Sequence, residues 1–137
     1  MQEKPLRTRV VVVDDHKIVR EGLATILSEQ PDIDVIAQAG NGREAIDLTS
    51  RLHPDVVIMD VSMPLMNGDE ATRQIKMMNP ETRIIALSMF EDSEMIQKMF
   101  RAGAENYVLK TAPSQSLLDA IRNKTGTPKK GTVAEIP

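Results

Sequence analysis

The stretch Val10-Val11-Val12-Val13-Asp14-Asp15 decides the fold, because an unbroken apolar run of this length is typical of a strand buried on both faces. A second such run, Val56-Val57-Ile58-Met59, also ends in a carboxylate, Asp60. Three carboxylates gathered at one edge of a sheet repel one another unless a metal ion or a lysine lies among them. We therefore expect the chemistry of this chain at Asp14, Asp15 and Asp60.

Strand-like and helix-like segments alternate five times along the chain. Short segments rich in β-branched residues predict strands at Arg9–Val13, Ile33–Gln38, Val56–Met59, Arg83–Ser88 and Asn106–Leu109. Apolar spacing and capping residues predict helices around Val19–Leu27, Asn41–His53, Asp69–Met78 and Ser93–Ala102, and a fifth that begins near Pro113. Five βα units with apolar strands imply an α/β protein whose parallel sheet carries helices on both faces.

The length and composition fit one domain. A chain of 137 residues, 41% of them hydrophobic, is large enough to form a single core. We expect this domain at residues 1–122. Residues 123–137 are rich in Lys, Thr, Gly and Pro, and both a linker to a further domain and a flexible tail fit this composition.

Several classes of protein are disfavoured by the composition. The sequence has no cysteine, which excludes disulfides and thiolate metal sites. It shows neither a signal peptide nor an apolar run long enough to span a membrane, so we expect a cytoplasmic protein. With a net charge of −3 and only Phe90, Phe100 and Tyr107 as aromatic residues, the chain itself is not expected to bind DNA.

The strand ends define a candidate site. In an open α/β sheet, ligands bind beyond the carboxyl ends of the strands, and these ends carry Asp14, Asp15, Asp60, Ser88 and Lys110. Mg2+ takes one or two carboxylates together with phosphate oxygens and water. Asp15 and Asp60 suit this role, with Asp14 holding a metal-bound water. Asp60 would also be the nucleophile that forms an aspartyl phosphate, with Lys110 and Ser88 supplying positive charge and a donor.

Each of these residues also has a plainer interpretation. Asp14 and Asp15 alone fit an acidic pair favoured by a helix dipole, and Lys110 alone fits a solvated lysine. His16 follows two acids, but an oxygen-ligand site does not need it, and we expect it to face solvent at the start of a helix. Only the combination of three acids, a hydroxyl and an amine favours a functional site.

The order of these residues resembles the receiver domain of two-component response regulators. The resemblance covers residues 8–122 and rests on four motifs, each weak alone and strong in this order. They are Val13-Asp14-Asp15-His16, Met59-Asp60-Val61-Ser62-Met63-Pro64, Leu87-Ser88 and Tyr107-Val108-Leu109-Lys110. The resemblance implies a flavodoxin-like (βα)5 sandwich with a five-stranded parallel sheet in the order 2-1-3-4-5.

The resemblance also implies a role for each site residue. Asp60 would be the phosphoacceptor, and Asp15, Asp60 and the backbone carbonyl of Ser62 would bind Mg2+, with Asp14 acting through water. Lys110 and Ser88 would bind the phosphoryl group.

A switch would follow from phosphorylation. Ser88 would move toward the phosphoryl group and Tyr107 would turn inward behind it, changing the face formed by the fourth helix, the fifth strand and the fifth helix.

One departure bears on the branch of the family. Many receivers carry proline directly after the conserved lysine, whereas here Lys110 is followed by Thr111-Ala112-Pro113. This variant, like the Asp-Asp-His start, resembles the branch that carries helix-turn-helix output domains. It implies transcriptional control, a sensor histidine kinase as partner, homodimerisation on phosphorylation, and contact with DNA only through an output domain outside this sequence.

Two other functions fit the sequence less well than the switch. An aspartyl-nucleophile phosphohydrolase commonly has a second Asp two residues after the nucleophile, where this chain has Ser62. A flavin or nucleotide binder uses a Gly-rich turn after the first strand, where this chain has acids. We therefore expect a signalling module with at most Mg2+-dependent self-phosphorylation and self-dephosphorylation.

Overall fold

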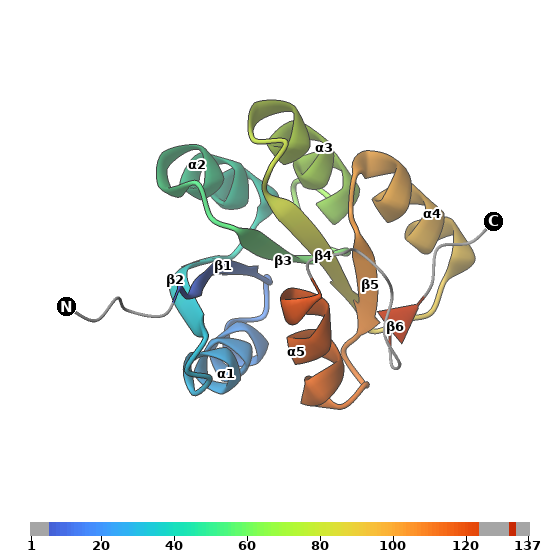
Figure 1. Ribbon diagram of the computed structural model, residues 1–137. Helices are drawn as coiled ribbons and strands as arrows, with labels where there is room; N and C mark the ends of the chain where they lie inside the picture. Colours follow the sequence, from blue (N-terminus) through green and yellow to red (C-terminus); the bar gives the residue numbers. More distant parts are fainter. Residues whose placement is uncertain (1–5, 124–131, 134–137) are drawn as a thin grey trace.

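The computed structural model describes residues 6–123 and 132–133. Strands and helices alternate along the chain (Figure 1). The strands are β1 (Thr8–Val13), β2 (Ile33–Ala39), β3 (Val56–Asp60), β4 (Arg83–Ser88), β5 (Asn106–Leu109) and β6 (Thr132–Val133). The helices are α1 (Lys17–Ser28), α2 (Gly42–Leu52), α3 (Gly68–Met78), α4 (Ser93–Ala102) and α5 (Ser114–Arg122). All five predicted βα units are present.

The sheet has the predicted flavodoxin-like strand order. Strands β2, β1, β3, β4 and β5 are neighbours in that order and all run parallel. A sixth strand, β6, pairs antiparallel with β5, placing Val133 opposite Tyr107. The sequence did not predict β6, because two residues carry no readable strand period. Apart from Asn123 and β6, the predicted linker or tail lies outside the described residues.

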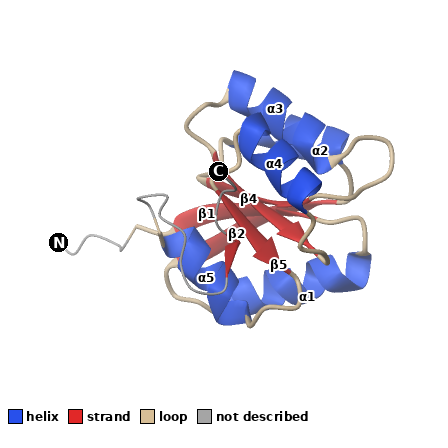
Figure 2. Ribbon diagram, turned by 90° about the vertical axis from the view of Figure 1, so that its right-hand side faces the viewer, coloured by secondary structure: helices blue, strands red, loops and turns tan. Residues whose placement is uncertain are grey.

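Helices cover both faces of the sheet, as predicted. Helices α2, α3 and α4 lie on one face, and α1 and α5 lie on the other (Figure 2). Right-handed crossovers of parallel strands produce this three-layer arrangement whenever the chain changes direction along the sheet. The carboxyl ends of all five parallel strands therefore meet at one edge, which is where the acidic residues were expected.

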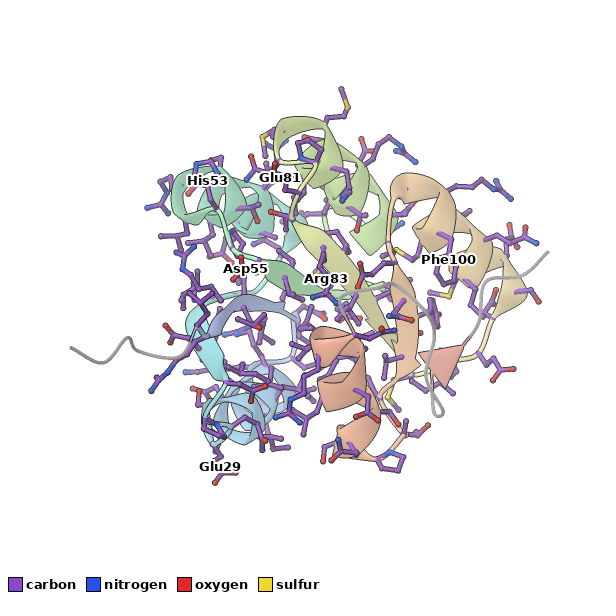
Figure 3. The ribbon with its side chains drawn as sticks, viewed as in Figure 1. Glu29, His53, Asp55, Glu81, Arg83 and Phe100 are labelled. Atoms are coloured by element: carbon purple, nitrogen blue, oxygen red, sulfur yellow. The ribbon has the colours of Figure 1, made fainter. Side chains whose placement is uncertain are left out.

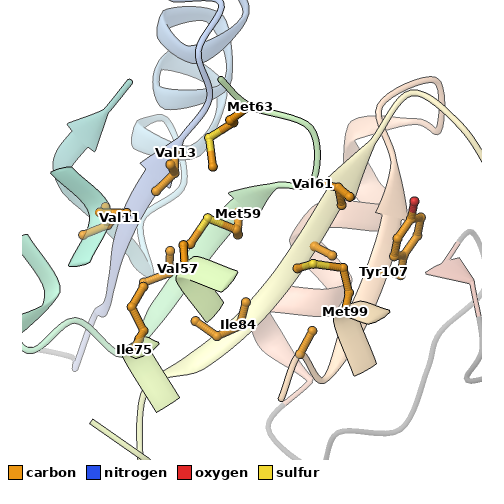
Figure 4. Close-up of a cluster of buried hydrophobic side chains, with 14 of the residues drawn as sticks. Val11, Val13, Val57, Met59, Val61, Met63, Ile75, Ile84, Met99 and Tyr107 are labelled. Atoms are coloured by element: carbon orange, nitrogen blue, oxygen red, sulfur yellow. The ribbon is translucent and has the colours of Figure 1, made fainter. Parts of the chain in front are cut away.

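The central strands are anchored in two hydrophobic clusters. Alternate residues of β1 and β3 point to opposite faces, because the side-chain period of a strand is two. The cluster under α2, α3 and α4 includes Val11, Val13, Val57 and Met59 (Figure 4). The cluster under α1 and α5 includes Val10, Val12, Val56 and Ile58. All eight side chains are fully buried, and burial of each stabilises the fold by about 1.5–3 kcal/mol. This packing fixes the positions of the strand ends.

Helix ends are fixed by capping residues. Asn41 caps α2 by accepting a hydrogen bond from the Glu44 amide at 2.9 Å, as the predicted capping box requires. The Glu44 carboxylate reaches back to the amide of Gly40 at 2.8 Å, one residue before the position expected for a capping box. Gly103 ends α4 with φ of 120°, a conformation that favours glycine.

Candidate functional site

The three predicted carboxylates meet at the carboxyl edge of the sheet. Val13 of β1 lies opposite Met59 of β3, so the residues that follow, Asp14 and Asp60, are neighbours. Asp14 is fully buried and Asp60 is 3% exposed. Oxygens of Asp14, Asp15 and Asp60 all lie within 4.8 Å of one another. The prediction that β1 and β3 bring these acids together is confirmed.

Lys110 enters the same cluster from the end of β5. Its Nζ lies 2.8 Å from Oδ2 of Asp14 and 3.5 Å from Oδ2 of Asp60, and its side chain is only 11% exposed. Its backbone amide donates to the carbonyl oxygen of Ser88 at 2.7 Å, which ties the ends of β4 and β5 together. One ammonium therefore contacts two of the three clustered carboxylates, which leaves an excess of negative charge at the site.

Burial raises the pKa of Asp60 to about 7. Desolvation is the largest cause, the charge of Lys110 opposes it, and the charge of Asp14 adds to it. The carboxylate is therefore costly to ionise in this setting unless further positive charge is present. This is the electrostatic environment expected of a site that takes up a cation.

The donor set fits a hard divalent cation. The buried oxygens Oδ1 of Asp15 and Oδ2 of Asp60 have no hydrogen-bond partner among the described residues. Unsatisfied buried carboxylate oxygens are costly, and Mg2+ prefers this type of ligand. The acidic cluster is compatible with Mg2+ binding.

The loop after β3 is built closely around Asp60. The Ser62 amide donates to Oδ1 of Asp60 at 3.3 Å, and the Gly68 amide donates to the Val61 carbonyl oxygen at 2.9 Å. A Cβ added to Gly68 would lie 2.4 Å from the backbone oxygen of Asp60, closer than atoms can approach. Gly68 thus lets α3 begin directly against the end of β3, and the metal role of the Ser62 carbonyl stays a prediction.

The two predicted switch residues are linked through the backbone of one residue. The Ser88 hydroxyl accepts a hydrogen bond from the Phe90 amide at 3.1 Å. The Tyr107 hydroxyl donates to the Phe90 carbonyl oxygen at 3.0 Å. Tyr107 is fully buried beside Met99 in the cluster of Figure 4, and burial raises the pKa of its phenol. Tyr107 therefore occupies the inward position in this structure.

Sequence reasoning missed the contributions of Phe90 and Arg20, and it assigned His16 no contact with the acids. Phe90 acts through its backbone, and its exposed side chain gives no sequence pattern to detect. Arg20 donates from Nη1 to the backbone oxygen of Asp14 at 2.8 Å, a contact that no spacing predicts. His16 opens α1 with its ring 70% exposed, as expected, yet Nδ1 lies 3.3 Å from Oδ1 of Asp15. Its position directly after two acids is the signal for this contact, although an oxygen-ligand site does not need the ring.

A hollow of about 690 Å³ lies at the opposite edge of the sheet, where β3 and β4 begin. His53, Asp55 and Arg83 are among its lining residues and are labelled in Figure 3. Two of its charged groups, Asp55 and Arg83, are held by structural partners. Asp55 accepts from the Arg9 amide at 2.8 Å, and Nη2 of Arg83 lies 2.6 Å from a carboxylate oxygen of Glu105. We therefore assign the chemistry to the acidic edge and not to this hollow.

Known proteins with similar sequences are named as transcriptional or oxygen regulatory proteins. The chain is 44% identical over 122 residues to the transcriptional regulatory protein LiaR of Bacillus subtilis, covering 88% of this chain and 58% of that protein. It is 44% identical over 115 residues to the oxygen regulatory protein NreC of Staphylococcus aureus, covering 83% of this chain and 53% of that protein. The chain thus spans little more than half the length of these relatives.

Solved structures of similar sequence share the fold. A LuxR-family two-component response regulator from Aurantimonas sp. SI85-9A1 superposes with a TM-score of 0.81 at 38% identity, covering 85% of this chain and 83% of that one. The response regulator domain of Thermotoga maritima CheB superposes with a TM-score of 0.81 at 34% identity, covering 90% of this chain and 99% of that one.

Among the described residues, no helix is long and apolar enough to cross a membrane.

The family assignment agrees with the geometry of the site. The family model for the response regulator receiver domain matches residues 10–122, which include all three carboxylates, Ser88, Tyr107 and Lys110. This family is one of signalling receivers, so it gives no support to the phosphohydrolase alternative. The chain belongs to the response regulator receiver domain family, with relatives among transcriptional regulators of the LuxR type.

Proposed function

We propose that this chain is a phosphorylation-dependent signalling switch in which Asp60 accepts a phosphoryl group from a histidine kinase. The supporting observation is the placement of a 3% exposed carboxylate between a lysine and two further carboxylates at the carboxyl edge of the sheet. An aspartate in such a site is set apart from solvent-facing carboxylates by its neighbours and its raised pKa.

In the transfer step, the phosphoryl group moves from an imidazole nitrogen of the donor to Asp60. A carboxylate oxygen of Asp60 forms a bond to phosphorus while the bond from phosphorus to the donor imidazole nitrogen breaks, and the leaving imidazole keeps the electron pair and takes up a proton. Bound Mg2+ supplies charge neutralisation for the transferring group. Asp15, Asp60 and the carbonyl of Ser62 would hold the ion directly, with Asp14 acting through water.

Lys110 and Ser88 are placed to receive the phosphoryl group. Lys110 Nζ lies 3.5 Å from Oδ2 of Asp60, so a phosphoryl group on that carboxylate would carry its oxygens toward the ammonium. The Ser88 hydroxyl lies at the end of the next strand, β4. Its hydrogen bond to the Phe90 amide is the contact that a move toward the phosphoryl group would break.

The shared backbone of Phe90 couples this move to Tyr107. Because Ser88 and Tyr107 bond to the amide and the carbonyl of the same residue, a shift of Ser88 alters the position of the group that holds the Tyr107 hydroxyl. The affected face comprises α4, β5 and α5. A receiver that changes this face on phosphorylation biases a two-state equilibrium toward a new partner or a homodimer.

The output of the switch would be transcriptional control. The relatives that this chain matches along about half their length are named as transcriptional and oxygen regulatory proteins. By analogy, DNA would be contacted by a separate output domain, and the phosphodonor would be a sensor histidine kinase in the cytoplasm. Self-phosphorylation from small phosphodonors and self-dephosphorylation are the only catalytic activities we assign.

Labelling with acetyl phosphate and Mg2+ tests this function. The wild-type chain should gain the mass of one phosphoryl group, and Asp60→Asn should gain none. Asp34→Asn, which removes an exposed carboxylate on β2 far from the site, is the matched control and should label like the wild type. Undiminished labelling of Asp60→Asn would overturn the proposal.

A further inference from the structure

His16 places an imidazole nitrogen at the edge of the acidic cluster. It is the residue before α1, and its backbone amide donates to Oδ1 of Asp14 at 2.9 Å, which fixes its position. Its ring Nδ1 lies 3.3 Å from Oδ1 of Asp15 and 3.4 Å from Oδ1 of Asp14. The ring makes no side-chain capping hydrogen bond to α1 and is 70% exposed, so it is available to bind a cation at the cluster.

Independent observations indicate that this cluster takes a ligand. Asp60 is more than nine-tenths buried, and its Oδ2 has the Lys110 ammonium at 3.5 Å but no hydrogen-bond partner among the described residues. The buried Oδ1 of Asp15, which faces the His16 ring, is likewise unpartnered by any hydrogen bond in the described part of the chain. A buried oxygen of this kind is costly unless a donor or a cation satisfies it.

The spacing of Asp15, His16 and Asp60 suits direct ligands of one octahedral ion, with Asp14 close enough to act through water. One ligand atom from each of Asp14, Asp15, His16 and Asp60 lies within 4.8 Å of all the others. Bonds of about 2.1 Å in an octahedron separate adjacent ligands by about 3 Å and opposite ligands by about 4 Å. The contacts of His16 with the two neighbouring acids fall near the first of these values.

We propose that His16 is a further ligand of the cation site, so that the site binds first-row transition ions such as Ni2+ more tightly than an all-oxygen site does. This inference rests on the metal site of the proposed function and adds to it a residue that determines which cation binds. Imidazole is a good ligand for Ni2+, Co2+ and Zn2+, whereas Mg2+ prefers oxygen. His16 therefore favours the transition ions and leaves the affinity for Mg2+ almost unchanged.

The competing explanation of the same contacts is an ion pair. A protonated His16 would neutralise Asp14 and Asp15 in the way that Lys110 neutralises Asp14. Such a ring would compete with every divalent cation for the same carboxylates. Its removal would then raise the affinity for Mg2+ and Ni2+ alike, the opposite of what a ligand predicts.

Calorimetric titration of the full, untagged chain with Mg2+ and with Ni2+ separates these cases. His16→Gln removes the ring nitrogen, and its Ni2+ affinity should fall by about tenfold or more, since even partners of metal ligands cost this much when removed. Its Mg2+ affinity should stay within about twofold of the wild type. His53, the second histidine of this sequence, lies beyond α2 at the other edge of the sheet (Figure 3), so His53→Gln is the matched control.

Each outcome of these titrations decides between the explanations. An equal loss of Mg2+ and Ni2+ affinity, a gain of both, or no change in His16→Gln would overturn the proposal. Retained Mg2+ binding in His16→Gln shows that this variant folds. If the wild type fails to bind Mg2+, the proposed function fails; if Mg2+ binds and His16 has no effect on Ni2+, only this inference fails.

Discussion

Burial of the Asp60 carboxylate makes the stability of the metal-free protein depend on pH. The pKa of this group is raised from 3.8 to about 7, mainly by desolvation. Since the folded-state pKa lies above the unfolded value, the folded state keeps a proton that the unfolded state has already lost between these pH values. The free energy of unfolding is therefore higher at low pH and falls as the pH rises toward 7.

The size of the effect depends on how many pH units are crossed between the unfolded-state and folded-state pKa values of Asp60. Between pH 5 and the folded-state pKa lie about two pH units, and each lowers the free energy of unfolding by about 1.4 kcal/mol. Raising the pH from 5 to 8 should therefore lower the free energy of unfolding by about 3 kcal/mol through Asp60 alone. Asp60→Asn keeps the shape of the neutral carboxyl group and removes its titration. This variant should lack that part of the pH dependence and should be the more stable protein at pH 8.

Urea unfolding followed by circular dichroism measures this difference. Wild type and Asp60→Asn are compared at pH 5 and pH 8 in the presence of EDTA, so that other titrating groups cancel in the difference between the two proteins. Asp34→Asn should keep the pH dependence of the wild type, because Asp34 is exposed on β2. The same change between pH 5 and pH 8 in wild type and Asp60→Asn would refute the electrostatic reasoning.

Three further substitutions test other parts of the structure. Gly68→Ala should lower the free energy of unfolding by about 1–3 kcal/mol in thermal or urea unfolding, because its Cβ would lie 2.4 Å from the Asp60 carbonyl oxygen; wild-type stability would contradict this. Lys110→Met should destabilise the metal-free protein by about 3–5 kcal/mol, since it leaves the buried Asp14 carboxylate without its 2.8 Å partner, and added Mg2+ should restore part of the loss. Asn106→Leu should raise the melting temperature, because neither side-chain amide atom of this fully buried residue has a hydrogen-bond partner among the described residues. A fall in the free energy of unfolding of more than about 1 kcal/mol would show that the amide is satisfied.

Much of the fold was predictable because its strands are apolar runs. Val10–Val13 and Val56–Met59 are short apolar runs rich in β-branched residues, which favour buried strands, and Asn41 with Glu44 marks a helix start by a local hydrogen bond. These patterns involve residues that are close in sequence, so they can be recognised without knowledge of the tertiary structure. The two-residue strand β6 carries no period of its own and could not be predicted, since only its pairing with β5 defines it.

The site was predictable as far as side-chain chemistry defines it. Asp14, Asp60 and Lys110 follow apolar strands, and parallel pairing brings such strand ends to one edge. The contributions of Phe90 and Gly68 were not predictable, because one acts through backbone atoms and the other through the absence of a side chain. Both depend on packing between elements, which the sequence does not display residue by residue.

Locating the phosphoryl group on the chain shows whether Asp60 is the phosphoacceptor. The wild-type chain is phosphorylated with acetyl phosphate and Mg2+, the acyl phosphate is reduced with borohydride, and the modified residue is identified by peptide mass spectrometry. We expect conversion of Asp60 alone among the site carboxylates, with Asp14 and Asp15 unchanged. Modification of Asp14 or Asp15 in place of Asp60, or no modified carboxylate, would contradict this expectation.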